Sequence, residues 1–177
     1  RQGRMGASVQ NLPGAEVYQA LASGAIDGTE WIGPWADEKA GFQEITKFYY
    51  TAGFHEPGAG LSLAMNREEF ESLTPAQQKI VETCAGENHQ FNLSQFLSNN
   101  SAALTRLQAA GVKTLEFPDG VWDAFAKASQ EVHDENMGDE LYKRVYDSYT
   151  ASMKSSASWI DKSDGAFLRQ RTRTQSM

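Results

Sequence analysis

Two short segments place a carboxylate beside an aromatic residue at the predicted end of a strand. The first is Thr29-Glu30-Trp31 and the second is Gly53-Phe54-His55-Glu56-Pro57-Gly58. Ligands of open α/β sheets bind at the carboxyl ends of the strands, so these are the expected positions for a site. Two carboxylates that converge there repel one another unless a cation or a proton lies between them. The two segments therefore predict one shared site.

The chemistry of such a site has several interpretations. Backbone carbonyls near the two carboxylates favour a hard cation such as Na⁺ or Ca²⁺, because these ions take oxygen ligands. Alternatively, Glu30 is a solvated residue at the strand end and Trp31 is a core aromatic residue. An acid/base pair of the glycosidase type is a further possibility, which depends on a carboxylate separation that a sequence does not contain.

Other residue types offer no competing site. The motifs Gly-x-Ser-x-Gly, His-Glu-x-x-His, Gly-x-Gly-x-x-Gly and the P-loop are absent. The histidines His55, His89 and His133 lie in three different predicted elements, and we interpret the last two as solvated or capping residues. A single cysteine, Cys84, excludes an internal disulfide and a Cys-rich zinc site, and its apolar helical face predicts an inert core thiol.

Composition places the chain among globular proteins and disfavours nucleic-acid binding. It has 177 residues, 40% of them hydrophobic, with 16 Lys plus Arg against 23 Asp plus Glu and a net charge of -7. That length suits one domain with a proper core, and a nucleic-acid surface needs concentrated positive charge. No apolar stretch approaches the roughly 20 residues of a membrane span, and no signal-peptide pattern opens the chain. With Arg1 in first place, we expect a processed or truncated chain.

The first part of the chain is predicted to alternate short strands and helices. A strand over 8–12, a helix that opens at Pro13 and ends before Gly24, and a buried strand over 25–31 form a β-α-β unit, which favours a parallel sheet. The following elements are predicted as a helix over 36–42, strands over 48–51 and 61–65, and a short helix over 66–73.

The second part of the chain is predicted to be mostly helical. Residues 75–110 contain no interior Pro and repeat apolar residues at helical spacing, which predicts a helix of about 54 Å. Such a helix either breaks near Gly86 or Asn99-Asn100 or braces two lobes. A strand over 112–117 and helices from Pro118 and Asp139 follow, and the polar tail 169–177 is expected to be disordered.

The residues around the first segment resemble a known family. The runs 12–21 and 24–35, which include Ala-Ile-Asp-Gly-Thr-Glu-Trp, are similar to the solute-binding subunit (DctP type) of tripartite ATP-independent periplasmic (TRAP) transporters. Within that family they resemble the branch that binds 2-oxo acids or related monocarboxylates. The similarity continues through Asp37-Glu38-Lys39, Phe48-Tyr49-Tyr50, the 53–58 loop and Leu73-Thr74-Pro75, and so covers nearly the whole chain.

The resemblance implies an α/β fold of the periplasmic binding protein kind, two-lobed and type II-like, with a long helix that braces the lobes. It also implies a metal site in which the Glu30 and Glu56 carboxylates and the Trp31 backbone carbonyl bind Na⁺ or Ca²⁺. Trp31, Phe54 and His55 are then expected to line the substrate cleft. His55 stands where the family pattern leads us to expect another aromatic residue.

One part of the family pattern is missing from the sequence. The N-terminal lobe, and the arginine that pairs with the substrate carboxylate, would lie before Arg1. Arg1 and Arg4 fall in a predicted helix ahead of the 8–12 strand, which is the wrong context for that arginine. Residues 1–177 are therefore expected to be the C-terminal part of such a protein, with half of the cleft.

Two function classes follow. The first is a periplasmic receptor, not an enzyme, that captures a small organic acid such as pyruvate and delivers it to TRAP membrane subunits. The alternative is a metal-assisted or acid/base hydrolase that uses Glu30 and Glu56, with His55 as the group that activates water. An incomplete cleft would also expose apolar surface, which favours a homodimer or a purely structural interaction module.

Overall fold

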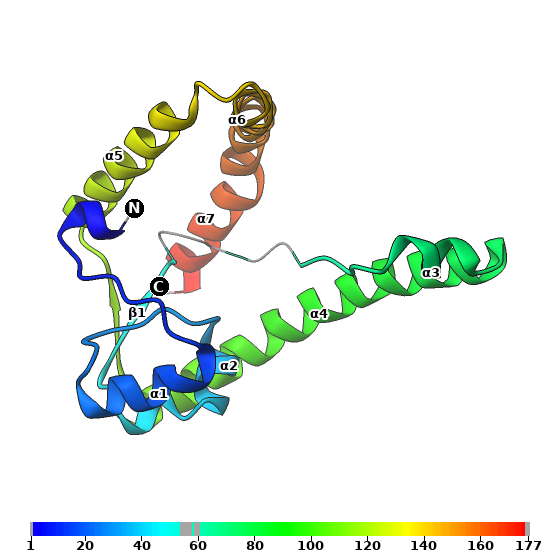
Figure 1. Ribbon diagram of the computed structural model, residues 1–177. Helices are drawn as coiled ribbons and strands as arrows, with labels where there is room; N and C mark the ends of the chain where they lie inside the picture. Colours follow the sequence, from blue (N-terminus) through cyan, green and yellow to red (C-terminus); the bar gives the residue numbers. More distant parts are fainter. Residues whose placement is uncertain (1, 54–57, 59–60, 176–177) are drawn as a thin grey trace. The chain divides into compact units, whose positions relative to one another are not determined.

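The structure is a computed structural model that describes residues 2–53, 58 and 61–175 (Figure 1). The chain divides into two compact units, one of Gly6–Asp123 and one of Arg1–Met5 with Ala124–Met177. The elements in chain order are η1 (Gln2–Met5), α1 (Gly14–Ser23), α2 (Pro34–Lys39), η2 (Phe42–Glu44), β1 (Phe48–Thr51), α3 (Arg67–Ser72), α4 (Pro75–Ala109), β2 (Lys113–Glu116), α5 (Asp119–Asn136), α6 (Glu140–Ile160), η3 (Asp161–Gly165) and α7 (Ala166–Gln175).

The described residues form a two-stranded parallel sheet. β1 and β2 pair with Phe48 opposite Lys113 and Thr51 opposite Glu116. Helix α4 lies in the connection between them, as a parallel pair requires a long crossover. The structure therefore contains a parallel sheet, but 48–51 and 113–116 form it, and the predicted β-α-β unit of strands 8–12 and 25–31 is wrong.

The predicted strand over 25–31 is wrong. The backbone N–H groups of Ala25 and Ile26 both donate to the carbonyl of Ala20, at 2.9 and 3.3 Å. Gly24 between them and the helix adopts a left-handed conformation, with φ 74°. These bonds close the C-terminus of α1, so the N–H groups that a strand would use point back to the helix. Residues 28–33 then run without regular structure to α2.

The predicted strands over 8–12 and 61–65 are also absent from the structure. Val9 is 57% exposed and Leu61 is 89% exposed, so these apolar residues are not buried in the described part of the chain. A strand is stabilised by a neighbouring backbone, and in the described residues the only paired strands are β1 and β2. Apolar runs of this length do not distinguish a strand from an extended segment.

Helix α2 packs on the C-terminal half of α4. The Trp35 and Phe96 rings meet edge to face with centroids 5.3 Å apart. The Asn100 side-chain oxygen accepts a hydrogen bond from the Trp35 backbone N–H at 3.0 Å. Arg106 forms two hydrogen bonds with the Glu38 carboxylate, at 2.7 and 2.6 Å. These contacts fix the short helix α2, which begins three residues after Trp31.

Helix α4 is continuous, as the Pro-free stretch predicts, and does not break at Gly86 or at Asn99-Asn100. It begins with a capping box, in which Thr74 and Gln77 each accept the other's backbone N–H. Its buried residues, Ala103 and Leu107, lie near its C-terminus. Cys84 is exposed, so its prediction as a core thiol is wrong. No described element covers the helix at that turn in the way α2 covers its C-terminal half.

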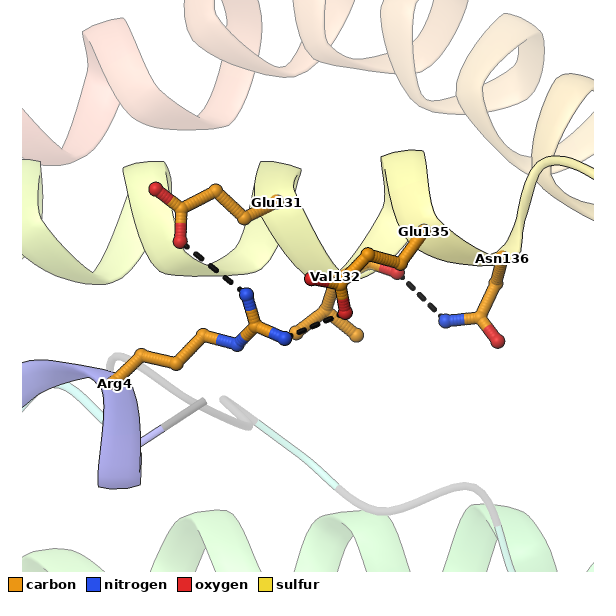
Figure 2. A network of polar contacts seen from close by, with 5 residues as sticks. All are labelled: Arg4, Glu131, Val132, Glu135 and Asn136. Atoms are coloured by element: carbon orange, nitrogen blue, oxygen red, sulfur yellow. Dashed lines mark hydrogen bonds and ion pairs between the residues drawn. The ribbon is translucent and has the colours of Figure 1, made fainter.

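The second unit is helical from Ala124 to Gln175, apart from the turn at 137–139. Asp139 caps α6 by accepting the Tyr142 backbone N–H at 2.8 Å. His133 is half-buried, and its Nδ1 lies 2.7 Å from the Tyr142 hydroxyl. Arg4 of η1 forms ion pairs with Glu131 and Glu135 of α5, at 3.5 and 2.5 Å (Figure 2).

The polar tail differs from its prediction. Helix α6 continues through one π turn, Asp161–Gly165, into helix α7, which extends to Gln175. Residues 166–175 contain neither Gly nor Pro, and three Arg and two Gln among them have good helix propensity. Arg169 also donates to the Asp161 carboxylate at 2.9 Å. An unpatterned sequence lacks a buried face, but it does not lack helix propensity.

Candidate functional site

The Thr29–Trp31 segment lies in the irregular chain between α1 and α2. Glu30 is exposed, whereas Trp31 is half-buried. The Thr29 hydroxyl donates to the Glu30 backbone carbonyl at 2.9 Å. Glu30 therefore lies at the surface of its unit, in a segment with helices on both sides.

The Trp31 ring is held between the start of α1 and η2. Its centroid lies 5.6 Å from that of Phe42, with the rings edge to face at 78°. A Cβ at Gly14 would meet the Trp31 Cη2 atom at 3.2 Å, so the absence of a side chain at Gly14 makes room for the ring. The ring is thus packed on its own unit, and the Trp31 backbone is anchored with it.

Asp37 is a buried carboxylate that organises the turn after Trp31. It is 7% exposed and lies on α2. Its Oδ1 atom accepts the backbone N–H groups of Ile32 and Gly33 at 3.1 and 3.0 Å. Its Oδ2 atom accepts the Tyr49 hydroxyl at 2.7 Å. Three donors satisfy the charge, which is the condition under which a buried carboxylate is tolerated.

Tyr49 stays a donor in this arrangement. Burial raises the pKa of the Tyr49 phenol, and the hydrogen bond to Asp37 and the negative charge of Asp37 raise it further. Since Tyr49 lies on β1, its hydrogen bond ties the strand to the turn at Ile32 and Gly33.

Sequence reasoning did not identify Asp37 or Tyr49 as site residues. Asp37 stands in the first turn of a short amphipathic helix, where an acidic residue is ordinarily solvated and favoured by the helix dipole. Tyr49 alternates with exposed aromatic residues in β1 and reads as a core position. The signal that could have identified Asp37 is the Gly33-Pro34 turn just before it. Such a turn leaves free N–H groups at the start of a helix, and an acidic side chain in the first turn can accept them.

Strand β1 leads into the second predicted segment. Thr51 ends the strand and donates from its hydroxyl to the Leu115 carbonyl at 3.3 Å. Ala52 follows with φ 59°, a left-handed conformation that costs an alanine roughly 1–2 kcal/mol. Strain of this kind clusters at binding and catalytic sites. Phe54, His55 and Glu56 lie outside the described residues, so their predicted roles stay predictions.

The Asp37–Tyr49 hydrogen bond joins the two chain segments that carry the predicted site. Ile32, which Asp37 holds, follows Trp31 directly, and Tyr49 precedes Gly53 by four residues. Within the ranges that the structure describes, no three His, Cys, Asp or Glu side chains gather in a metal-binding cluster. The Glu30, Trp31 and Glu56 ligand set therefore remains a prediction that the described residues do not test.

No described helix combines the length and the hydropathy that crossing a bilayer requires. A shallow hollow of about 720 Å³ lies along α6 and is lined by that helix alone, from Leu141 to Tyr149. One helix face offers no convergent polar groups, so this hollow is not a second candidate site.

Known proteins match this chain at the level of sequence and of structure. A monocarboxylate 2-oxoacid-binding periplasmic protein of Nostoc sp. is 38% identical over 157 residues, which are 88% of this chain and 43% of that protein. A TRAP periplasmic solute-binding protein from Pseudoalteromonas atlantica T6c, solved with sodium and pyruvate, is 32% identical with a TM-score of 0.87, covering 94% of this chain and 51% of that one.

A further structure gives the same result. The TRAP periplasmic solute-binding protein from Colwellia psychrerythraea, solved with calcium and pyruvate, is 30% identical with a TM-score of 0.89, covering 95% of this chain and 52% of that one. The chain thus spans about half the length of the proteins it matches. The predicted α/β fold of the periplasmic binding protein kind is confirmed by these structures.

The family assignment agrees with both comparisons. Residues 3–139 match the family model described as bacterial extracellular solute-binding protein, family 7 (DctP). The matched range includes the Thr29–Trp31 segment, helix α2 with Asp37, both strands and the whole of α4. The chain belongs to family 7 of the bacterial extracellular solute-binding proteins.

Proposed function

We propose that this chain is the C-terminal part of an extracytoplasmic receptor that captures a small organic acid anion, in particular a 2-oxo acid such as pyruvate. The observation that carries the proposal is the match of most of this chain to proteins whose names or structures specify 2-oxo acids. The substrate would be delivered to the membrane subunits of a TRAP transporter, and the protein would work in the periplasm.

A bridging metal ion is part of the proposal. Glu30 and Glu56 would bind the ion through their carboxylates, and Trp31 would bind it through its backbone carbonyl. This set of hard oxygen donors suits Na⁺ or Ca²⁺, the ions present with pyruvate in the two similar structures. The position of Glu30 supports this role, because it is an exposed carboxylate residue next to Trp31. The bound ion would supply the positive charge that attracts the substrate carboxylate.

The chain's own residues would shape the cleft around that ion. Trp31, Phe54 and His55 would line the substrate and exclude water from it. Excluding water strengthens the attraction between the ion and the carboxylate, because the local dielectric constant falls. Trp31 is suited to this role because Phe42 and Gly14 hold its ring in place.

The proposal includes a homodimer. It is supported by exposed apolar side chains of α6, which are Leu141, Val145, Tyr149 and Met153.

The alternative function, hydrolysis by Glu30 and Glu56, is not favoured, because the matching family and structures are solute-binding proteins.

A thermal-shift screen tests the proposed function. The 177-residue chain and a version extended to the length of its relatives are each mixed with pyruvate, other 2-oxo acids or lactate, in the presence of Na⁺, Ca²⁺ or a chelator. We expect a rise in the melting temperature of the extended version that needs both acid and metal, since ligand binding stabilises the folded state. Slow consumption of an ester or a glycoside without any such rise would favour the hydrolase.

A further inference from the structure

The hydrogen bonds of Asp37 define which way the Trp31 carbonyl faces. The Asp37 carboxylate accepts the N–H of Ile32, which belongs to the same peptide group as the carbonyl of Trp31. The described chain contains no cis peptide bond. In a planar trans peptide the N–H and the C=O point in opposite directions. The Trp31 carbonyl oxygen therefore faces away from Asp37.

We propose that Asp37 is the positioning residue of the metal site, which holds the Trp31 carbonyl in the orientation that binds the ion. This inference rests on the proposed function and adds to it a residue that does not touch the ion. Asp37 would act by binding the opposite edge of the ligand's own peptide group. Its role is comparable to that of a carboxylate that orients a metal-bound histidine through the far ring nitrogen.

The Asp37 side chain is itself prevented from turning. Its Oδ1 atom is held by two N–H groups of consecutive residues, Ile32 and Gly33, and its Oδ2 atom by the Tyr49 hydroxyl. Rotation of the carboxylate would break bonds on both oxygens. The orientation of the Trp31 peptide is therefore set before any ion binds, so binding does not have to order it.

The backbone that carries Asp37 is fixed as well. Helix α2 is attached to α4 by the Trp35–Phe96 ring contact, and Asn100 holds the Trp35 N–H. The Glu38–Arg106 pair also joins the two helices, but Arg106 is 56% exposed, so the ring contact and the Asn100 hydrogen bond hold α2 in place without it. The position of the Trp31 peptide is thus fixed relative to the long helix α4.

The charge of Asp37 has a second effect on the carbonyl. A hydrogen bond from an amide N–H to a carboxylate is stronger than one to a neutral oxygen. Such a bond polarises the peptide group and increases the negative charge on its carbonyl oxygen. A more negative Trp31 carbonyl binds a hard cation more strongly. Position and polarity therefore change together when Asp37 is substituted.

Two substitutions on the same helix separate this role from a general effect. Asp37→Asn keeps the shape and one acceptor oxygen but removes the charge. Glu38→Gln also removes one negative charge from α2, but its partner is Arg106 and not the Trp31 turn. Each variant is made in the version extended to the length of its relatives. Calorimetry then measures Ca²⁺ affinity and pyruvate affinity, and a melting curve without metal measures stability.

We expect Asp37→Asn to weaken Ca²⁺ binding roughly tenfold and Asp37→Ala to weaken it up to about a hundredfold, the range seen when a residue behind a metal ligand is replaced. Glu38→Gln is expected to lower the melting temperature while Ca²⁺ affinity stays within about twofold of the parent. If Asp37→Ala does not fold, Asp37→Asn decides, because it fills the same volume.

The possible failures are distinguishable. Ca²⁺ affinity within about twofold of the parent in Asp37→Asn and in any folded Asp37→Ala would overturn the positioning role alone. An equal loss of affinity in Glu38→Gln and Asp37→Asn would also overturn it, because net charge would then explain both. Absence of pyruvate binding that depends on Ca²⁺ or Na⁺ in the unsubstituted protein would overturn the proposed function and this inference with it.

Discussion

The Tyr49 hydroxyl donates a hydrogen bond of 2.7 Å to the Oδ2 atom of Asp37, and this contact joins strand β1 to helix α2. The same carboxylate holds the backbone of Ile32 and Gly33. One buried side chain therefore connects the turn after Trp31 with the strand that leads to the 53–58 segment. The two predicted parts of the site share a structural anchor.

The raised pKa of Tyr49 predicts a loss of stability in alkali. Burial raises this pKa first, followed by the hydrogen bond and the charge of Asp37. In the unfolded chain a tyrosine ionises near pH 10, whereas in the folded protein Tyr49 remains protonated there. Its contribution to the free energy of unfolding is therefore complete below about pH 10 and is lost as the pH rises toward the folded pKa.

Denaturant titrations near pH 9 and pH 11 measure this effect. The decline in unfolding free energy is expected to be smaller in Tyr49→Phe than in the parent, by less than about 1.4 kcal/mol per pH unit because the ring is only half-buried. Parallel declines in the two proteins would contradict the assignment.

The ion pair between Glu38 and Arg106 predicts a loss of stability in acid. The hydrogen bond from Arg106 lowers the pKa of Glu38 most, its positive charge adds to this, and burial opposes both. The pair's contribution is therefore present above the ordinary pKa of 4.5 and is lost as the pH falls through the lowered folded value. Between about pH 5 and pH 3 the melting temperature of Glu38→Gln should fall less than that of the parent. Arg106→Gln should reduce the fall in the same way, and an unchanged fall in either variant would argue against the pair.

Two phenylalanines on α4 provide a matched test of the α2–α4 packing. Phe96 is half-buried against Trp35, whereas Phe91, five residues earlier, is 60% exposed. Phe96→Ala is expected to reduce the free energy of unfolding by about 2 kcal/mol, less than for a fully buried phenylalanine. Phe91→Ala should change it by no more than about 0.5 kcal/mol. Denaturant unfolding compares the two, and equal effects would show that the packing is not where the structure has it.

The capping box of α4 predicts a specific effect at Thr74. Thr74→Ala removes the side chain that accepts the Gln77 backbone N–H and is expected to cost about 1 kcal/mol of unfolding free energy. Ser94→Ala on the same helix serves as the control, because Ser94 is exposed and bonds only to the carbonyl of Gln90. A cost at Ser94 as large as that at Thr74 would exclude a capping effect.

The parts of the fold that were predictable carry local signals. Thr74-Pro75 marks the start of α4, Asp139 marks the start of α6, and Gly24 marks the end of α1, each through capping chemistry that neighbouring residues determine. Strands have no such local signal, because they depend on a neighbouring backbone. The runs 48–51 and 113–116 pair with each other, whereas the predicted strands 8–12 and 61–65 do not pair in the described structure.

The candidate site shows the same limit. Glu30 and Trp31 are predicted as site residues because their residue types suggest a ligand and because the surrounding motif resembles a family. Asp37 and Tyr49 are twelve residues apart in the sequence and form a hydrogen bond. Neither an Asp in the first turn of a helix nor a Tyr in a short strand indicates by itself that the two form a buried pair. A residue that acts by holding another residue's backbone is visible only when the hydrogen bonds are known.

The measurement that tests the central claim most directly is a calorimetric titration of pyruvate into the version extended to the length of its relatives, first with Ca²⁺ and then with a chelator. In a buffer free of Na⁺, the proposed receptor predicts binding with Ca²⁺ present, no measurable binding with the chelator, and affinity at least roughly tenfold weaker in Glu30→Gln, because a metal ligand is lost. Pyruvate binding that is equally strong with the chelator and in Glu30→Gln would contradict the metal-bridged site.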